Sequence, residues 1–467
     1  MKIKTGLYTW VIMLTMALAM LSSPFHALRS TAFALSIEEE TTLGEKFLAQ
    51  VKKEYELIDD HFADQFFNNL GHYLITPLET KPFPFSFYIV NDNTLNAFAA
   101  PGGNIFMFSG LIDSFDSIDE LSAVICHEIG HVSARHLSQR IDQGKKIGMA
   151  TMAGVLAGAL IGGKAAGALM SGSMAAGMQT QLYYSRTDER QADQLGFRYM
   201  TSASFDPGAM ISALKKIERG RCLGTEKIPT YLLTHPSGPE RMSDLDTMLN
   251  SYKPPPPKKE AARFRKIFPF FKTVVRAKSL DFHEAKRLFT LDLKKDPNDP
   301  VPLFGLGIIY RERSEYPDAI HYLKKAHEKK PRFIPIITSL AEAYRMNGQA
   351  GLAVSTLEEA LKLDQGNRSI LYMLGLSYEK LDLYKKAIHL FEKLAALPPV
   401  RNEVYYHLGL SYGRQDSLAL AHYNFGIFFR KSGQIRKAKF HFRKADELSG
   451  GDAALREKIN KAAEGPR

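Results

Sequence analysis

Apolar and polar residues along the first half of the chain follow a pattern that predicts helices around a few short strands. Between residues 36 and 80 apolar positions recur at helical spacing, after three consecutive glutamates that suit a helix start. Aromatic and β-branched residues predict strands at residues 83–90 and 105–108. Further helices are expected at residues 117–140, 184–200 and 207–219. This half is therefore expected to be an α+β domain, mostly helical with a small sheet.

The second half repeats a pattern of small and apolar residues every 34 residues. Leu306-Gly307 and Tyr310 recur as Leu340-Ala341 and Tyr344, as Leu374-Gly375 and Tyr378, and as Leu408-Gly409 and Tyr412. This is the tetratricopeptide (TPR) spacing, in which stacked helix pairs bury the faces that each pair cannot bury alone. A further match follows after only 17 residues, at Phe425-Gly426, and predicts one helix shared by two units. An all-α TPR solenoid is expected.

The order of these patterns predicts four segments. Residues 1–34 contain Lys2 and Lys4, an uncharged apolar stretch and Ala32-Phe33-Ala34, and so predict a secretory signal peptide, with an uncleaved anchor as the alternative. The α+β domain is expected at residues 35–250, a proline-rich basic linker at 251–265 and the TPR domain at 266–467. Either reading of the first segment predicts an exported protein.

One internal segment and the two cysteines leave alternatives open. Residues 147–181 are rich in Gly, Ala and Met with Lys164 as their one charge, which fits a close-packed helix pair, a flap over the site or a hairpin that dips into a membrane. Cys126 and Cys222 are too few for a disulfide framework, and they are either paired with each other or thiols.

The positive charge of the chain is concentrated in one place. The formal net charge is +11, yet residues 251–280 hold nine basic side chains against the single acid Glu260. So narrow a stretch is a surface feature and does not indicate a nucleic-acid-binding protein. It predicts that a groove of the TPR array near Lys253–Lys278 docks clients or partners, or that the stretch contacts a membrane surface; a merely solubilising linker is the alternative.

His127-Glu128-Ile129-Gly130-His131 is an HExxH motif within a predicted helix. Residues four apart share a helix face, so both imidazoles can bind one metal ion while Glu128 lies beside the bound water. The spacing predicts a catalytic zinc site with Glu128 as the general base. Gly130 costs about 1 kcal/mol relative to Ala inside a helix, which indicates that another chain segment or the metal lies close to it.

A catalytic zinc needs a third protein ligand, and the positions directly after the motif do not supply one. Ala134 and Leu137 stand where the longer HExxHxxGxxH pattern requires Gly and His. Glu189 is the best candidate, and Asp193 lies one helical turn further on. Asp193 is expected either to hold a ligand histidine in its correct tautomer or to share in proton transfer. The same residues also fit an ordinary solvated, charge-rich helix.

His235 lies in Leu233-Thr234-His235-Pro236, and Pro236 keeps it out of a helix interior. A loop can carry this imidazole to the open zinc position, where a fourth protein ligand would displace the nucleophilic water and hold the enzyme latent. A substrate-binding role, stabilisation of the oxyanion and a purely structural role are the alternatives.

Several of these segments together resemble the M48 family of gluzincin peptidases. Ser185-Arg186, Glu189 and Ala192-Asp193 are similar to its SRxxExxAD signature, and Asn96-Ala97-Phe98-Ala99 with Pro101-Gly102-Gly103 is similar to its NAFA and PGG segments. Arg135-His136 after the HExxH motif and Thr234-His235-Pro236 also resemble family segments. The resemblance covers roughly residues 40–250. It implies zinc at His127, His131 and Glu189, Glu128 as base and Asp193 as proton donor.

An exported M48 domain followed by TPR repeats resembles the β-barrel assembly-enhancing proteases of the bacterial periplasm. This resemblance implies one Zn²⁺ per subunit, unfolded or stalled outer-membrane proteins as substrates, and the outer-membrane assembly machinery as a partner of the TPR repeats. We expect the strand at residues 105–108 to hold extended substrates by edge pairing. The alternative is a proteolytically silent TPR scaffold or chaperone of the envelope.

Overall fold

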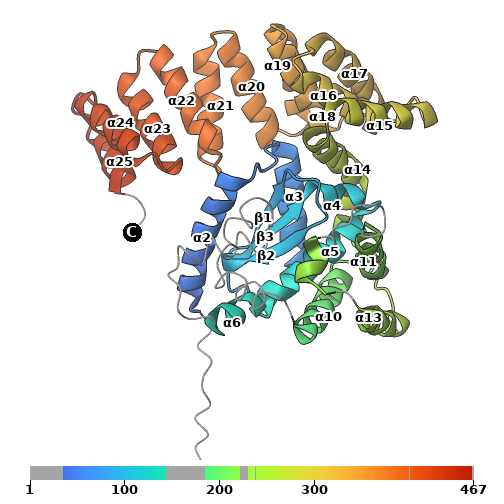
Figure 1. Ribbon diagram of the computed structural model, residues 1–467. Coiled ribbons are helices and arrows are strands. Elements are labelled where there is room, and N and C mark those ends of the chain that lie inside the picture. Colours follow the sequence, from blue (N-terminus) through green and yellow to red (C-terminus); the bar gives the residue numbers. More distant parts are fainter. Residues whose placement is uncertain (1–34, 144–184, 221–229, 237, 399, 465–467) are drawn as a thin grey trace, which may run out of the picture.

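The computed structural model describes residues 35–143, 185–220, 230–236, 238–398 and 400–464 (Figure 1). The predicted signal peptide, the whole 147–181 segment and Cys222 therefore lie outside the described residues, and Cys126 is a buried free thiol. A small sheet wrapped by helices makes up the first domain, and the helical array curves above it in Figure 1. The predicted fold class, a helix-rich α+β domain followed by TPR repeats, is confirmed. None of the described helices is long and apolar enough to cross a membrane.

The sheet has the strand order β1-β3-β2, with β1 at Ser86–Val90, β2 at Ala97–Ala100 and β3 at Asn104–Phe108. β3 pairs in parallel with β1 and antiparallel with β2. The expectation that residues 105–108 pair with a substrate is therefore wrong, because β3 is the central strand and already has a neighbour on each side. The short edge strand is β2. The chain passes from β2 to β3 through the 3-10 turn Pro101–Gly103, where Gly102 and Gly103 have φ of 75° and 79°.

Both faces of the sheet are covered by helices. The predicted helical region 36–80 forms two helices, α2 (Ile37–Glu54) and α3 (His61–Leu74), because Asp60 caps a new helix after a short extended segment. Phe47 of α2 packs edge-on against Phe98 and Phe106 on one face. On α3, the Asn68 amide bonds both the backbone N–H and the carbonyl of Phe87 in β1.

The helix that carries the HExxH motif is shorter than predicted. Instead of one helix over residues 117–140, the chain forms α5 (Ile118–Ser133) and α6 (His136–Gln143), broken where Arg135 takes a φ of 55°. The remaining helices of this domain are α4 (Ser109–Ser114), α10 (Arg186–Ser202), α11 (Gly208–Gly220), α12 (Thr230–Thr234) and α13 (Pro239–Ser251).

The predicted linker is only partly a linker. Residues 252–258 are non-helical, but α14 (Lys259–Ser279) begins inside the expected 251–265 segment and packs against both domains. Five of the nine basic side chains of this stretch bind carboxylates or carbonyls of the chain: Lys258 to Ser202, Arg265 to Asp119, Lys272 to Phe115, Arg276 to Asp113 and Lys278 to Glu312. More than half of the expected basic docking surface is therefore used to join α14 to the rest of the molecule.

The C-terminal array consists of helices that stack in sequence order from α15. They are α15 (Phe282–Lys295), α16 (Pro300–Glu312), α17 (Tyr316–Lys329), α18 (Ile334–Met346), α19 (Ala350–Leu363), α20 (Arg368–Lys380), α21 (Tyr384–Ala395), α22 (Asn402–Arg414), α23 (Leu418–Lys431), α24 (Ile435–Glu447) and α25 (Ala453–Glu464).

The predicted shared helix is α23, which explains the half-step in the repeat. In the regular units a small residue of the first helix faces a large side chain of the second, as a Cβ added at Gly375 would lie 2.7 Å from the Phe391 ring. α23 contributes to both kinds of contact. Its Phe425 fills the space over Gly409 of α22, and its Gly426 receives Phe442 of α24. One helix thus closes one unit and opens the next.

Candidate metal centre

Two helices that cross closely bring the site together. α5 and α10 meet at Gly130, where an added Cβ would lie 2.8 Å from the Ala192 carbonyl oxygen, and at Gly196, which faces the backbone of Cys126. The predicted close approach at Gly130 is thus a contact with α10. Only glycine lets the two backbones come so near, and this crossing sets the third candidate ligand beside the HExxH face.

The four predicted ligands converge at this crossing. His127 and His131 lie one turn apart on α5, Glu189 lies in the first turn of α10, and His235 directly follows α12. One donor atom from each of the four lies within 4.8 Å of every other, and all four residues are buried. His131 Nε2 is 3.3 Å from Glu189 Oε1, and His235 Nδ1 is 3.0 Å from the same oxygen.

This donor set suits a zinc ion. Zinc prefers imidazole nitrogens and carboxylates as ligands, and three imidazoles with one carboxylate would fill its four tetrahedral positions. His127 Nε2 lies 3.0 Å from His131 Nε2 and 3.4 Å from His235 Nδ1. Nitrogen lone pairs brought so close in a dry site repel each other unless a proton or a cation lies between them. A metal cation would satisfy all four donors together.

Glu128 lies beside this cluster without joining it. Its side chain is fully buried, and Oε1 is 3.5 Å from His235 Nε2. Neither carboxylate oxygen has a hydrogen bond of ordinary geometry among the described residues. Burial raises the pKa of this carboxyl above its usual value, and the nearby histidines oppose the shift. A carboxylate in this setting is a stronger base than one in water.

Asp193 faces the opposite edge of the His127 ring. Its Oδ1 accepts a hydrogen bond from His127 Nδ1 at 2.9 Å, which leaves His127 Nε2 directed into the cluster. Arg241 of α13 donates to both Asp193 oxygens at 2.8 Å. Although burial, the largest single influence, raises the pKa of Asp193, the charges and hydrogen bonds of Arg241 and His127 together outweigh it, and the pKa is lowered. Of the two roles expected for Asp193, this geometry fits the orientation of a ligand.

Two further residues support the ligands and were not assigned roles from the sequence. Arg241 also places Nη1 2.6 Å from Glu189 Oε2. His136 Nδ1 lies 3.0 Å from His131 Nδ1, and its Nε2 lies 3.0 Å from Gln191 Oε1 on α10. His136 was visible as part of a motif. No sequence motif marked Arg241. It lies on α13, and only the fold brings that helix back against α10.

The loop that carries His235 is held by its neighbours. The ring stacks on Tyr231 with centroids 4.5 Å apart, and the His235 N–H binds the Tyr231 carbonyl at 2.8 Å. Arg241 Nη1 donates to the Pro236 carbonyl at 3.3 Å. The structure thus places all six residues singled out from the sequence within one connected, buried network.

Two protein-family models match separate parts of the chain. A model of peptidase family M48 matches residues 67–249, and a model of anaphase-promoting complex subunit 3 matches residues 312–394. The β-barrel assembly-enhancing protease of Yersinia pestis is 34% identical over 231 residues, which cover 49% of this chain and 47% of that protein. The mitochondrial metalloendopeptidase OMA1 of Arabidopsis thaliana is 31% identical over 200 residues, 42% of this chain and 39% of that protein.

The β-barrel assembly-enhancing protease of Escherichia coli K12 is 31% identical over 229 residues, 48% of this chain and 47% of that protein. The chain spans about half the length of these two β-barrel assembly-enhancing proteases. A crystal structure of MamA aligns with 38% of this chain and 96% of that one, at 25% identity and a TM-score of 0.30. Residues 67–249 therefore belong to the M48 metallopeptidase family, and the chain continues into C-terminal TPR repeats.

Proposed function

We propose that this protein is an exported zinc-dependent endopeptidase that acts in the quality control and assembly of outer-membrane β-barrel proteins, and that it also holds unfolded chains as a chaperone. One observation carries the catalytic part of the proposal. His127, His131 and Glu189 converge in a buried site directly beside Glu128, a carboxylate with no hydrogen bond of ordinary geometry. Metallopeptidase chemistry needs this combination of ligands and free base.

The residues of the chain divide the work between them. His127, His131 and Glu189 would hold the ion, which would supply Lewis-acid activation of a water and of the scissile carbonyl. Glu128 takes the proton of the attacking water and returns it to the leaving amine. Asp193 keeps His127 in the tautomer whose Nε2 faces the ion, and Arg241 holds Asp193 and Glu189 in place. Asp193 thus acts through His127 and not as the proton donor.

His235 gives the site a closed state. As a fourth protein ligand it would occupy the position that the nucleophilic water needs, so the loop after α12 must move before turnover. This closed arrangement also favours the second candidate function, an envelope chaperone whose peptidase site stays silent. A client or partner that draws the loop away would convert one state into the other.

Substrate class, partners and compartment rest on the sequence and on relatives. Relatives named β-barrel assembly-enhancing proteases match about half of this chain, and residues 1–34 predict export to the periplasm. We assign the edge strand β2, which packs beside α5, to hold extended substrates by strand pairing. Backbone pairing gives loose sequence selectivity, which suits unfolded or stalled outer-membrane proteins. The TPR repeats would contact their assembly machinery.

Zinc content and casein cleavage, measured on wild type and Glu128→Gln, test the catalytic part. We expect about one zinc per chain in both proteins and cleavage by wild type alone. A zinc-loaded wild type that cleaves no substrate would favour the chaperone. Crosslinking in cells with Glu128→Gln, which can bind clients but not cleave them, tests the substrate class. Recovery of no outer-membrane protein would contradict it.

A further inference from the structure

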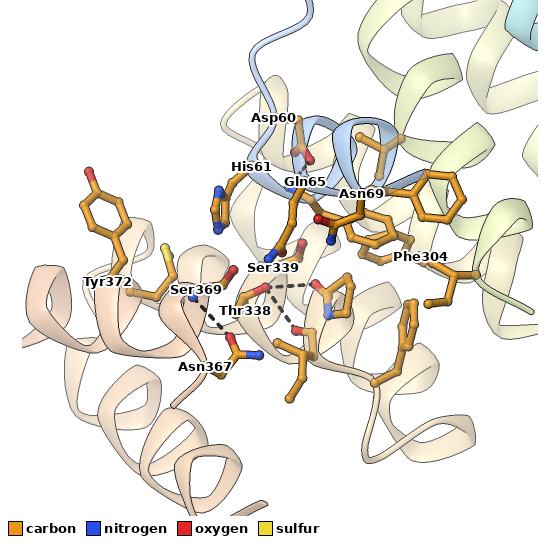
Figure 2. A pocket seen from close by; sticks show the side chains of 18 of the residues that line it. Asp60, His61, Gln65, Asn69, Phe304, Thr338, Ser339, Asn367, Ser369 and Tyr372 are labelled. Atoms are coloured by element: carbon orange, nitrogen blue, oxygen red, sulfur yellow. Dashed lines mark hydrogen bonds between the residues drawn. The ribbon is translucent and has the colours of Figure 1, made fainter. Parts of the chain in front are cut away.

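A large cavity lies between the two domains, away from the metal centre. Its volume is about 990 Å³, and it is lined by α3 on the peptidase side, by α14, and by α16, α18 and α20 on the TPR side (Figure 2). We call it the interdomain groove. Neither domain alone forms it. We infer that the interdomain groove binds an extended segment of unfolded polypeptide, and that the peptidase domain itself forms one wall of this site.

The two walls offer hydrogen-bonding groups without charge. Figure 2 shows Gln65 and Asn69 of α3 directed into the groove toward Thr338 and Ser339 of α18. Gln65 and Asn69 are exposed, and within the described part of the chain their side chains and that of Ser339 have no hydrogen-bond partner. A side-chain amide both donates and accepts, as a peptide unit does. Amides one helical turn apart can therefore bind successive backbone groups of an extended chain.

Aromatic side chains lie beside these polar groups. Phe62 of the peptidase wall meets Phe333 of the TPR wall edge-on, with ring centroids 6.1 Å apart, and Phe304 and Tyr372 line the same cavity. The Arg401 guanidinium lies over the Tyr372 ring at 5.1 Å. Apolar surfaces between amides suit an unfolded polypeptide, whose apolar side chains alternate with its polar backbone.

The charges of the groove disfavour a polyanion. Six acidic side chains and five Lys or Arg side chains line it, so it carries little net charge. Several of them neutralise each other, since Arg311 pairs with Glu342 at 2.7 Å and Lys278 with Glu312 at 3.0 Å. Nucleic acid or an anionic lipid surface would need an excess of unpaired cations. An unfolded polypeptide of mixed sequence does not.

This inference rests on the proposed peptidase function, because it names where that enzyme holds a long substrate. Binding is measured on the full-length, zinc-loaded Glu128→Gln protein, with fluorescein-labelled β-casein as the probe and fluorescence anisotropy as the signal. In that background, Gln65→Ala with Asn69→Ala should raise the Kd about tenfold, as expected for two lost hydrogen bonds. Gln194→Ala with Gln365→Ala, exposed amides outside the groove, should leave the Kd unchanged.

Ser339→Trp on the opposite wall fills the groove and should also weaken casein binding at least tenfold. Thermal melts report whether the Ser339→Trp protein folds. If it does not fold, the Gln65→Ala, Asn69→Ala double variant still decides the test. Wild-type affinity in the Ala pair would overturn the inference. If polyphosphate displaced casein while the Gln65→Ala, Asn69→Ala variant bound casein as wild type does, the binding would be due to surface cations. This result would also overturn the inference.

Cleavage assays separate this inference from the proposed function. In the active protein, Gln65→Ala with Asn69→Ala should raise the KM for casein severalfold and leave kcat unchanged. A hexapeptide is too short to reach from the metal site to the groove, so this variant should cleave it with the same kcat and KM as wild type. An unchanged KM for casein would refute polypeptide binding in the groove but leave the proposed peptidase activity intact. An inactive wild type would refute the proposed peptidase activity. The anisotropy measurement would still show whether the groove binds polypeptide.

Discussion

Arg241 and Glu189 form a buried ion pair, with 2.6 Å between Arg241 Nη1 and Glu189 Oε2. The same guanidinium donates two hydrogen bonds to Asp193. One cation from α13 therefore fixes both a candidate metal ligand and the carboxylate that orients another. Because the charges are almost fully removed from water, they depend on each other far more than a surface pair does.

Removal of Arg241 should therefore destabilise the fold and the metal site together. Arg241→Ala removes the buried cation that faces both carboxylates, and we expect a loss of about 3–5 kcal/mol in the free energy of unfolding. Urea denaturation of the zinc-loaded protein measures it. Arg190→Ala is the matched control, because Arg190 joins the same two helices through Asp244 at an exposed position. It should cost less than about 1 kcal/mol. Equal losses would refute the role of Arg241.

Glu189 and Glu128 should separate metal binding from catalysis. Glu189→Ala removes a ligand, so it should lose both zinc and casein cleavage. Glu128 is not a ligand, and glutamine has the same shape, so Glu128→Gln should keep zinc. Because the base is lost, cleavage should fall at least 1,000-fold, about 4 kcal/mol in activation free energy. Zinc analysis after dialysis distinguishes them. Full zinc occupancy in Glu189→Ala would reassign the third ligand.

His235→Ala tests the closed state by the sign of its effect. If His235 blocks the position of the nucleophilic water, its removal should raise casein cleavage or self-cleavage severalfold at unchanged zinc content. If it stabilises the oxyanion, the same change should lower kcat about 100-fold. Turnover and zinc content are measured on the same preparation. Unchanged or reduced cleavage with zinc bound contradicts the latch.

Gly130→Ala should be destabilising although alanine favours helices. The added Cβ would lie 2.8 Å from the Ala192 carbonyl oxygen, so α5 and α10 must separate. We expect a loss of about 1–3 kcal/mol and weaker zinc retention. Gly351 of α19 has open space around it, so Gly351→Ala should instead gain up to about 1 kcal/mol. Thermal melts compare the pair, and a stabilised Gly130→Ala would show that the crossing is not tight.

Asp64 of α3 should make the stability of the fold fall as the pH rises from acidic to neutral values. Burial, followed by the charges of Asp59 and Asp60, raises the pKa of this carboxyl to about 7. Its charged form is disfavoured in the folded state, so stability is lost as the pH rises from about 4 through 7. Asp64→Asn should thus be more stable than wild type at pH 8, on the order of 1–3 kcal/mol, and equal to it at pH 4. Melts at both values measure this, with exposed Asp246→Asn as control. Equal melts at pH 8 contradict the shift.

Periodicity alone determined much of the architecture. The 34-residue repeat predicted the solenoid, and even its half-step at Phe425-Gly426, because TPR packing depends on residue size at fixed offsets within a local helix pair. The HExxH spacing likewise placed His127 and His131 on one face, since four residues make about one helical turn. These are local properties, and each depends on neighbours in sequence.

Tertiary structure decided what depends on residues far apart. Strand order made β3 central and left β1 and β2 at the edges of the described sheet, which no strand pattern reveals. The crossing of α5 and α10, the return of α13 and the turn after α12 brought Arg241, Asp193 and His235 to the same ion site. The basic stretch looked like a free surface, but five of its nine cations bind carboxylates or carbonyls contributed by other segments. The positions of charged residues along a sequence cannot show which of them the fold pairs with groups from other segments.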